Sequence, residues 1–317
     1  MELKVRDVPE MYTEMMRLMK MRAFVEDSRN GGVLSLREPL TVTVTHPATR
    51  INVDPIRRCN PFFHVMEFVW MMSGSNSPMW ISTFNKRFVE YADWDHRTEP
   101  TIHGAYGNRW RSHFDVDQIV TAVGMLQEDP TSRRVVLSMW DAYTDLGTAH
   151  NDLPCNTHVY LRILNDALDM TVCNRSNDVI WGMTGANAVH MTMLQELMAN
   201  AIGCEVGVYR VFTNNAHVYT DLPNVGKMLD TTAVYYPSND GVTPIKYEGF
   251  PLLQPHESIV SFLEDCESFI EGSTITRSYW LNAVASPMYE LWFNRELDTD
   301  YILDKGWAAA CAQWLRP

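Results

Sequence analysis

A cysteine directly after a proline, Cys155 in the stretch DLPCNTHVYLRI (residues 152–163), is the residue whose position first suggests covalent chemistry. It stands at the start of an apolar segment that predicts a buried strand. The chain has six cysteines but no CxxC pair, which favours neither a zinc site nor a disulfide framework. A lone cysteine is more often a small buried hydrophobe than a nucleophile, so the surrounding groups must decide its role.

Three polar motifs offer the groups that a nucleophilic thiol would need around it. SRR (residues 132–134) places two adjacent guanidinium groups just before a predicted strand. NRSND (174–178) offers an arginine, a hydroxyl and a carboxylate, and NNAHVYTD (214–221) places His217 and Tyr219 on one face of a strand because strand side chains alternate. Each motif alone is common on protein surfaces. Together, a thiol and several donors suited to phosphate predict a nucleotide site with a nucleophile.

The predicted helices and strands that must position these groups follow one another in an irregular order. Helical periodicity marks residues 8–25, 62–74, 115–130, 188–203 and 257–272, and strand-like patterns mark 40–46, 134–140, 157–164, 167–174 and 205–212. The order lacks the regular βαβ alternation of a nucleotide-binding sheet, and the chain has no GxGxxG motif. We therefore predict an α+β fold, with a large mixed sheet packed against helices.

Composition and charge limit the classes of function. The chain has 317 residues, 46% of them hydrophobic, which is enough for one large core. The net charge of −13 argues against a nucleic-acid-binding protein, which usually has a basic face, but it allows a small anionic ligand held by a local group of arginines. No apolar run is long enough to span a membrane, and the first residues carry charges where a signal peptide needs an apolar stretch. We expect a cytoplasmic protein without membrane or nucleic-acid partners.

In order and spacing, these motifs resemble the thymidylate synthase superfamily. The matching pattern is SRR before a strand, Pro154-Cys155, the RSND run at 175–178 and the HVY run at 217–219. Three upstream segments match as well: SRNGG with Arg29, HVMEFVWMMSG with Glu67 and Trp70, and YGNRW with Tyr106. The similarity extends to about residue 221. We therefore expect a catalytic core at 1–221 and a C-terminal extension at 222–317, packed on the same domain.

The resemblance implies a role for each matching residue. Cys155 would add to C6 of a pyrimidine nucleotide, Glu67 would manage protons at the ring through water, and Tyr106 would help to remove the C5 proton. Asp178, also expected to be catalytic, would face the pterin of 5,10-methylenetetrahydrofolate, with Trp70 as a further folate contact and no metal required. The family is a homodimer with a sheet face as its interface. The 5′-phosphate would be held by Arg29, Arg175 and Ser176 together with Arg133 and Arg134 of the second subunit, and the sugar 3′-hydroxyl by His217 and Tyr219.

The chemistry explains why a thiol is needed. A pyrimidine C5 is a poor nucleophile until a group adds at C6, and a thiolate is a soft and strong adding group. The nearby arginines would help to ionise the thiol. Once the one-carbon unit is on C5 as an exocyclic methylene, hydride from the folate gives a methyl group, whereas water gives a hydroxymethyl group.

Several departures from the synthase pattern favour water. Asn156 stands where the synthases have a histidine after the nucleophile. The segment FNKRFVEYADW offers Phe88, Val89 or Tyr91 where the synthases place a tryptophan that shields the methylene. The chain ends in GWAAACAQWLRP rather than in the synthase's short apolar lid, and NRSNDVIWG is closer to the nucleotide hydroxymethylases of the superfamily. We therefore predict a hydroxymethylase.

The choice of base rests on Asn187 and on its neighbour Asn156. The spacing to His217 assigns Asn187 as the base-reading residue, with one extra residue in MTGA (183–186). An amide can read either uracil or cytosine, because it offers both a donor and an acceptor. The chain looks most like the cytidylate hydroxymethylases, including the CMP enzymes of nucleoside-antibiotic (mildiomycin-type) biosynthesis, so we expect CMP or dCMP as substrate. A dUMP hydroxymethylase, a true methyl-transferring synthase and an inactive nucleotide- or RNA-binding member remain the alternatives.

Overall fold

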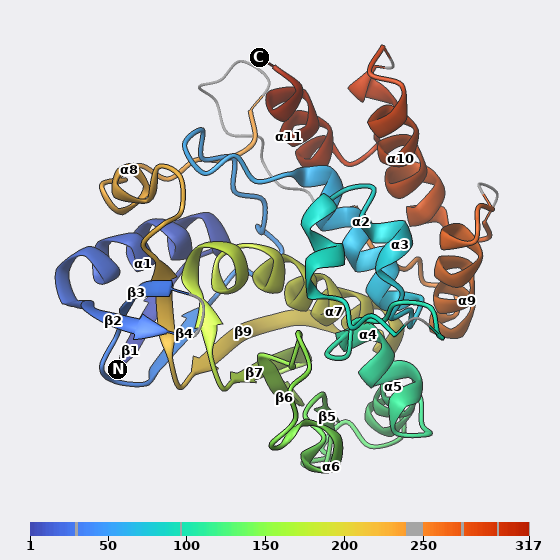
Figure 1. Ribbon diagram of the computed structural model, residues 1–317. Coiled ribbons are helices and arrows are strands. Elements are labelled where there is room, and N and C mark those ends of the chain that lie inside the picture. The colour runs from blue at the N-terminus through green and yellow to red at the C-terminus, as the bar shows by residue number, and fades with distance from the viewer. Residues whose placement is uncertain (29–30, 96, 239–249, 274–275, 297, 317) are drawn as a thin grey trace.

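A mixed sheet of six strands forms the centre of the chain, in the order β1-β4-β9-β7-β6-β5 (Figure 1). In that order the strands span Glu2–Val5, Leu40–Val44, Glu205–Thr213, Ala167–Asn174, Asn156–Leu164 and Val136–Ser138. This structure is a computed structural model, and it describes residues 1–28, 31–95, 97–238, 250–273, 276–296 and 298–316. The predicted α+β class with a large mixed sheet is confirmed.

The two faces of this sheet differ in burial. The register aligns Val42, Val211, Val172, Val159 and Leu137 in a row across neighbouring strands, and all of them are buried. Helix α7 (Ala186–Ile202) covers this apolar face and contacts β7 and β9 (Figure 1). Such a row of branched apolar side chains against a helix is the expected core of an α+β fold.

The opposite face of the sheet remains open to solvent in the single chain. Side chains one position along the same strands point to it, because successive residues alternate between faces. Val136 and Tyr160 are directly paired there and are 42% and 46% exposed, and Phe212 is 36% exposed. This face therefore presents apolar surface that the chain does not cover itself.

A smaller sheet of four strands, in the order β2-β3-β10-β8, joins the polar motifs. Its strands span Phe24–Ser28, Gly31–Ser35, Ala216–Tyr219 and Asn177–Asp178. In this sheet His217 of β10 is opposite Asp178 of β8. The NRSND and HVY motifs, which are about 40 residues apart in the sequence, are thus brought side by side by strand pairing.

The helices begin and end largely where the sequence predicts. Asn60 caps α2 by accepting from the Phe63 N–H at 3.2 Å, Asp117 caps α5 in the same way, and Gly203 ends α7 in the left-handed conformation with φ 87°. Among the described residues, none of the helices has both the length and the apolar character needed to cross a membrane. Besides α7, the helices span Val8–Arg22 (α1), Pro61–Met72 (α2), Pro78–Ile81 (α3), Tyr106–Asn108 (α4), Gln118–Glu128 (α5), Ala142–Asp145 (α6), Val225–Leu229 (α8), Ile259–Ile270 (α9), Ser286–Phe293 (α10) and Lys305–Leu315 (α11).

One boundary differs from the prediction. The helix predicted over 8–25 ends at Arg22, and Phe24 and Val25 belong to β2 instead. Every residue of β2 is exposed, so the strand carries no alternation of buried and exposed positions that a sequence pattern could reveal.

The C-terminal helices pack against α2 rather than forming a separate unit. Helices α9, α10 and α11 all contact α2 (Figure 1). The ring of Phe62 lies 5.5 Å from Trp292 and 5.6 Å from Trp314, and the ring of Phe68 lies 6.1 Å from Trp280. Their buried residues belong to the same hydrophobic cluster as the central sheet.

Candidate active site

Cys155 lies in the loop just before β6, and one arginine approaches its sulfur. Arg175 Nη2 is 3.7 Å from Cys155 Sγ. The same guanidinium donates from Nε to the Pro154 carbonyl and from Nη2 to the Leu153 carbonyl, each at 2.9 Å. The Arg175 main-chain N–H also donates to the Cys155 carbonyl at 3.0 Å. Arg175 thus holds the cysteine loop from both its side chain and its main chain, and the predicted proximity of NRSND to the thiol is found.

In the single chain the thiol is not activated. Burial raises the pKa of Cys155, and the positive charge of Arg175 lowers it only in part, while the carboxylates of Asp152 and Asp178 raise it further. We expected several arginines to help ionise the thiol, but among the described residues Arg175 is the only arginine that lowers its pKa. Additional positive charge is needed before the thiolate dominates at neutral pH.

Tyr106 and Asn156 lie beside the nucleophile. The Asn156 main-chain N–H donates to the Tyr106 hydroxyl at 3.2 Å, and burial, followed by the nearby Cys155, holds the pKa of Tyr106 well above its usual value. Gly107 allows this placement because any Cβ there would overlap the Met71 carbonyl of α2. Both side-chain polar atoms of Asn156 are buried and have no hydrogen-bond partner in the described structure. An amide left unpaired in this way is available to a ligand.

Glu67 lies on α2 with its side chain only 13% exposed. Burial, and next the charge of Asp152, raise the pKa of Glu67 to about 8. Its Oε2 atom is buried and makes no hydrogen bond within the described ranges. At neutral pH this carboxyl group therefore holds its proton and can act as an acid.

Asp152 is a functional candidate that sequence reasoning missed. Burial raises the pKa of Asp152 to about 6, although a main-chain hydrogen bond from Gly104 and the charge of Arg175 lower it. Gly104 lies so close that a Cβ there would meet Asp152 Oδ2 at 2.6 Å. The only signal in the sequence is its position three residues before Cys155, which no periodicity marks.

A small cavity of about 200 Å³ brings several predicted residues together. Its lining includes Glu67, Trp70, Tyr106 and Asn187, with Asp152, Phe88 and Tyr91 completing the wall. Trp70 is 2% exposed and donates its indole N–H to the Ser77 carbonyl at 2.9 Å, so it borders the cavity as part of the core. Of the three candidates for the methylene-shielding position, Phe88 and Tyr91 reach this cavity.

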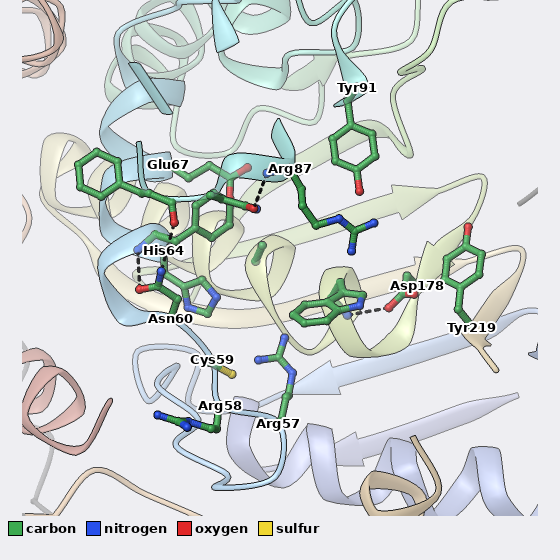
Figure 2. A pocket seen from close by; sticks show the side chains of 15 residues that line it. Arg57, Arg58, Cys59, Asn60, His64, Glu67, Arg87, Tyr91, Asp178 and Tyr219 are labelled. Carbon is green, nitrogen blue, oxygen red and sulfur yellow. Dashed lines mark hydrogen bonds between the residues drawn. The ribbon is translucent and has the colours of Figure 1, made fainter. Parts of the chain in front are cut away.

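A larger cavity of about 390 Å³ adjoins Glu67 and Tyr91 (Figure 2). Asp178 lies on its wall: Oδ1 accepts from the Trp181 N–H at 2.6 Å, whereas Oδ2 is buried and has no partner in the described parts of the chain. Burial raises the pKa of Asp178 to about 6. Figure 2 shows Arg57, Arg58 and Arg87 around the same hollow.

Arg57 is the second functional candidate that the sequence did not reveal. It donates from Nε to the Ile180 carbonyl at 3.0 Å, and its guanidinium lies 5.5 Å from the ring of Trp181. Its Nη1 atom is buried without a partner among the described residues, and burial lowers the pKa of Arg57. A buried cation with a spare donor at a cavity wall is suited to an anionic or polar ligand group.

Ser176, His217 and Tyr219 line a more open hollow of about 320 Å³. The rings of His217 and Tyr219 are 5.2 Å apart on the same face of β10, as the alternation predicts. His217 Nδ1 donates to Asn215 Oδ1 at 2.8 Å, and Ser176 Oγ lies 3.4 Å from both of these atoms. The hollow thus gathers hydroxyl and imidazole groups.

The two SRR arginines, which are also predicted phosphate ligands, are not gathered here. Arg133 and Arg134 are exposed just before β5, and Arg134 borders a separate hollow with Trp140 and Val136. Arg29 lies outside the described residues. Within one chain, therefore, the site contains Arg175 and Ser176 but not the SRR arginines.

One group in the described residues has the composition of a metal site. Single ligand atoms of Asp93, His103 and His150 lie within 4.8 Å of one another. The two imidazole rings are stacked, however, with centroids 3.6 Å apart and planes 7° from parallel. Nitrogen lone pairs lie in the ring plane, so these rings do not converge on one ion. Instead, each histidine bonds a carboxylate, His150 to Asp93 at 2.6 Å and His103 to Asp145 at 2.7 Å.

Comparison with known proteins places this chain in a family. Residues 29–238, more than half of the chain, match the thymidylate synthase family. The chain therefore belongs to that family, and the predicted enzyme class, a folate-dependent one-carbon transferase, is confirmed at this level.

Three relatives carry the same name. A deoxyuridylate hydroxymethyltransferase of Pseudomonas phage M6 is 42% identical over 258 residues, which cover 79% of this chain and 72% of the relative. The protein of that name from Delftia phage PhiW-14 is 32% identical over 228 residues, covering 68% and 61%. The one from Bacillus phage SP01 is 29% identical over 211 residues, covering 61% and 54%. The predicted similarity to nucleotide hydroxymethylases is thereby confirmed.

Proposed function

We propose that this protein is a deoxyuridylate hydroxymethyltransferase, which converts the C5–H bond of dUMP into a C5–CH₂OH group. The observation that carries the proposal is the placement of Glu67, Tyr106 and Asp152 on the wall of one cavity, with the Tyr106 hydroxyl bonded beside Cys155, in a chain whose relatives are named for this reaction. The matched relatives extend beyond this chain, so the activity of the whole protein is part of the proposal.

Cys155 is the nucleophile in this reaction. Its Sγ adds to C6, and the electron pair moves to C5 and the neighbouring carbonyl oxygen. The protonated Glu67 carboxyl group donates toward that carbonyl, directly or through water, which stabilises the enolate-like charge. The hydroxyl of Tyr106, held at the Asn156 N–H, lies next to the thiol and guides removal of the C5 proton.

Water completes the reaction. Its oxygen adds to the exocyclic methylene carbon, its proton passes to the surrounding carboxyl groups, and elimination of the Cys155 sulfur restores the C5–C6 double bond. Tyr91 supports this route, because it borders both cavities, presents a hydroxyl group and is one of the three candidates for the position where the synthases have a shielding tryptophan. Asp152, whose pKa is about 6, is a further acceptor near the thiol.

The choice of uracil replaces our preference for cytosine. All three relatives are named for deoxyuridylate, and they come from phages, so the expected antibiotic-biosynthesis setting is not confirmed. The unpaired amide of Asn156 and the amide of Asn187 suit either base, because each offers a donor and an acceptor. The cytidylates CMP and dCMP therefore remain the comparison substrates.

The larger cavity fits a folate. Asp178 Oδ2, buried and unpaired in the described structure, is an acceptor for pterin N–H groups, and Trp181 offers a ring face beside it. Arg57, Arg58 and Arg87 supply cations for the carboxylates of the glutamate tail. Bound there, the folate supplies the one-carbon unit at the oxidation level of formaldehyde.

A homodimer completes the phosphate site. The open face of the sheet, with Val136, Tyr160 and Phe212 exposed, is an apolar surface suited to a second copy. Arg133 and Arg134 lead directly into this face through β5. In the dimer these arginines reach the partner's Cys155 site, where they bind the 5′-phosphate and add the positive charge that the thiol lacks in one chain.

Mass spectrometry of the products from dUMP, dCMP and CMP, each with methylenetetrahydrofolate in isotopically labelled water, tests the proposal. We expect a hydroxymethyl product from dUMP that carries the solvent oxygen, and no oxidation of the folate. A methyl product with formation of dihydrofolate would identify a synthase. Turnover of a cytidylate alone would restore the cytosine assignment, and turnover of none would contradict the enzyme.

A further inference from the structure

A buried histidine on α7 lies against Glu67, and the proposed reaction gives it no role. His190 Nε2 is 3.5 Å from Glu67 Oε2 and 3.1 Å from the main-chain carbonyl oxygen of His64. His190 is 2% exposed, and Glu67 Oε2 makes no hydrogen bond among the described residues. The imidazole is therefore the polar group adjacent to this buried oxygen.

The His64 carbonyl determines which nitrogen of His190 carries the hydrogen. A carbonyl oxygen only accepts, so Nε2 must be the N–H of the ring. Burial lowers the pKa of His190 to about 3, so the ring is neutral in the working range and carries a single N–H. That N–H donates to the His64 carbonyl, and Glu67 Oε2 lies 3.5 Å from the same nitrogen without a hydrogen bond to it among the described residues.

This donor distinguishes the two oxygens of Glu67. A protonated carboxyl group has one accepting oxygen and one O–H. A proton on Oε2 would face the His190 N–H, so it is disfavoured there. Oε2 is also fully buried, whereas the side chain as a whole keeps 13% of its surface exposed, which leaves Oε1 toward the cavities.

We propose that His190 is a positioning residue: its Nε2–H, 3.5 Å from Glu67 Oε2, disfavours a proton on that oxygen, so that Oε1 carries the proton and exchanges it with the bound pyrimidine or with water. The proposal rests on the proposed function only for the identity of that proton partner. The fixed orientation itself is a property of the free protein.

The other ionisable groups around this pair do not take over the role. Asp152 acts on Glu67 through its charge and raises the pKa of the carboxyl group. His64 faces His190 edge-on with ring centroids 6.2 Å apart, and burial holds the pKa of His64 well below its usual value. Arg57 acts on His64 rather than on Glu67.

Infrared difference spectroscopy of the substrate-free protein tests the effect on Glu67. The carbonyl band of the protonated Glu67 carboxyl group is identified by its loss in Glu67→Gln and is followed as a function of pH. In His190→Leu the band should move to higher frequency, and its titration midpoint should rise by about half to one pH unit, because a donor to the ionised form is lost. His190→Gln places an amide N–H near the position of Nε2 and should restore both values.

Controls separate this effect from a disturbed helix. Thr192→Val on the same helix removes a buried hydroxyl that, among the described residues, bonds only the Ala188 and Val189 carbonyls, and it should leave the band unchanged. In nitrogen-15 spectra of histidine-labelled protein, the signal lost in His190→Gln should have the shift of an Nε2–H tautomer. This second measurement needs only the folded wild-type protein and that conservative variant.

The outcomes are decisive in both directions. An unchanged band and midpoint in His190→Leu, or an Nδ1–H tautomer in the wild type, would overturn the proposal. A shift in His190→Leu that His190→Gln does not reverse would also overturn it, because burial of an apolar group would then explain the change. These readouts need no turnover, so failure to hydroxymethylate any nucleotide would remove the proposed function and leave this test intact.

Discussion

The reacting end and the phosphate end of the proposed site differ in how complete they are within a single chain. At the reacting end, Cys155, Glu67, Tyr106 and Asp152 lie together, and burial raises the pKa of each. At the phosphate end, Ser176 and His217 line an open hollow whose other walls include the acidic residues Glu26 and Asp27.

The comparison indicates that the two ends are assembled in different ways. Carboxyl groups that must hold protons need a low dielectric, which a packed core supplies at once. A dianionic phosphate needs several cations, and a single chain that concentrated them would have an unbalanced cluster of like charge until its ligand arrived. In the proposed homodimer, delivery of Arg133 and Arg134 by the partner would avoid that cost, and the predictions below test this proposal.

Loss of the thiol should have the largest effect. Cys155→Ala removes the atom that adds to C6, so turnover should fall by about four orders of magnitude or more. Binding of dUMP, measured by calorimetry, should persist because the phosphate ligands remain. Cys204→Ala, at the distant end of α7, is the matched control and should keep full activity. Appreciable turnover in Cys155→Ala would exclude the covalent step.

Mixed dimers should reveal whether the phosphate end is shared. Arg134→Ala alone should lower turnover by about a hundredfold, because a charge-assisted phosphate contact is lost. When Arg134→Ala and Cys155→Ala chains are mixed and allowed to exchange, half of the dimers are hybrids with one intact site, so about a quarter of wild-type activity should return. If the arginine acted within its own chain, no activity would return.

Removal of one exposed cation at the folate cavity should have a moderate effect. Arg87→Met keeps much of the side-chain volume and removes the charge, so the KM for the folate should rise by about tenfold, and more for a polyglutamylated folate. The KM for dUMP should not change. Arg17→Met, on the exposed surface of α1, serves as the control. Equal effects on both substrates would place Arg87 outside the folate contact.

The smallest expected effect is a dependence of stability on pH. Folded Glu67 has its pKa raised from 4.5 to about 8, and Asp152 and Asp178 have theirs raised from 3.8 to about 6. These three carboxyl groups keep protons in the folded protein that the unfolded chain releases, so the stability that they contribute is lost as pH rises through these values. The buried, neutral His64 and His190 act in the opposite sense below about pH 6.5, because folding lowers their pKa values. Tm should therefore fall by a few degrees between about pH 6.5 and about pH 8.5, where the raised pKa of Glu67 dominates. In Glu67→Gln the fall above about pH 6.5 should disappear, as scanning fluorimetry can measure.

Where a residue's role follows from its local sequence context, the sequence predicts it. Where the role depends on tertiary packing, the sequence does not. The strands and the long helices follow from apolar periodicity, and Glu67 stands out because a carboxylate in an apolar helix needs an explanation. Burial in the folded protein raises the pKa of Asp152, and the main-chain hydrogen bond from Gly104, 48 residues away in the sequence, partly offsets it. Arg57 matters because it lies under Trp181 and bonds Ile180, a tertiary contact that no local pattern encodes.

His190 is a further residue whose role could not be predicted from the sequence. His190 lies in a helix that is buried nearly all round, where a lone histidine is usually a packed side chain. Its contact with Glu67 joins α7 to α2, and only the fold brings those helices together.

Helices α9, α10 and α11 lie beyond residue 238, where the family match ends, yet they contact α2, and the rings of Trp280, Trp292 and Trp314 pack against Phe62 and Phe68 of that helix. The pKa of Glu67 stays raised only while water is excluded from its surroundings on α2. A sequence change in these appended helices that admits water would lower the acid–base midpoint of a residue it never touches. These helices therefore help to keep water away from Glu67 and so to maintain the raised pKa of its carboxyl group.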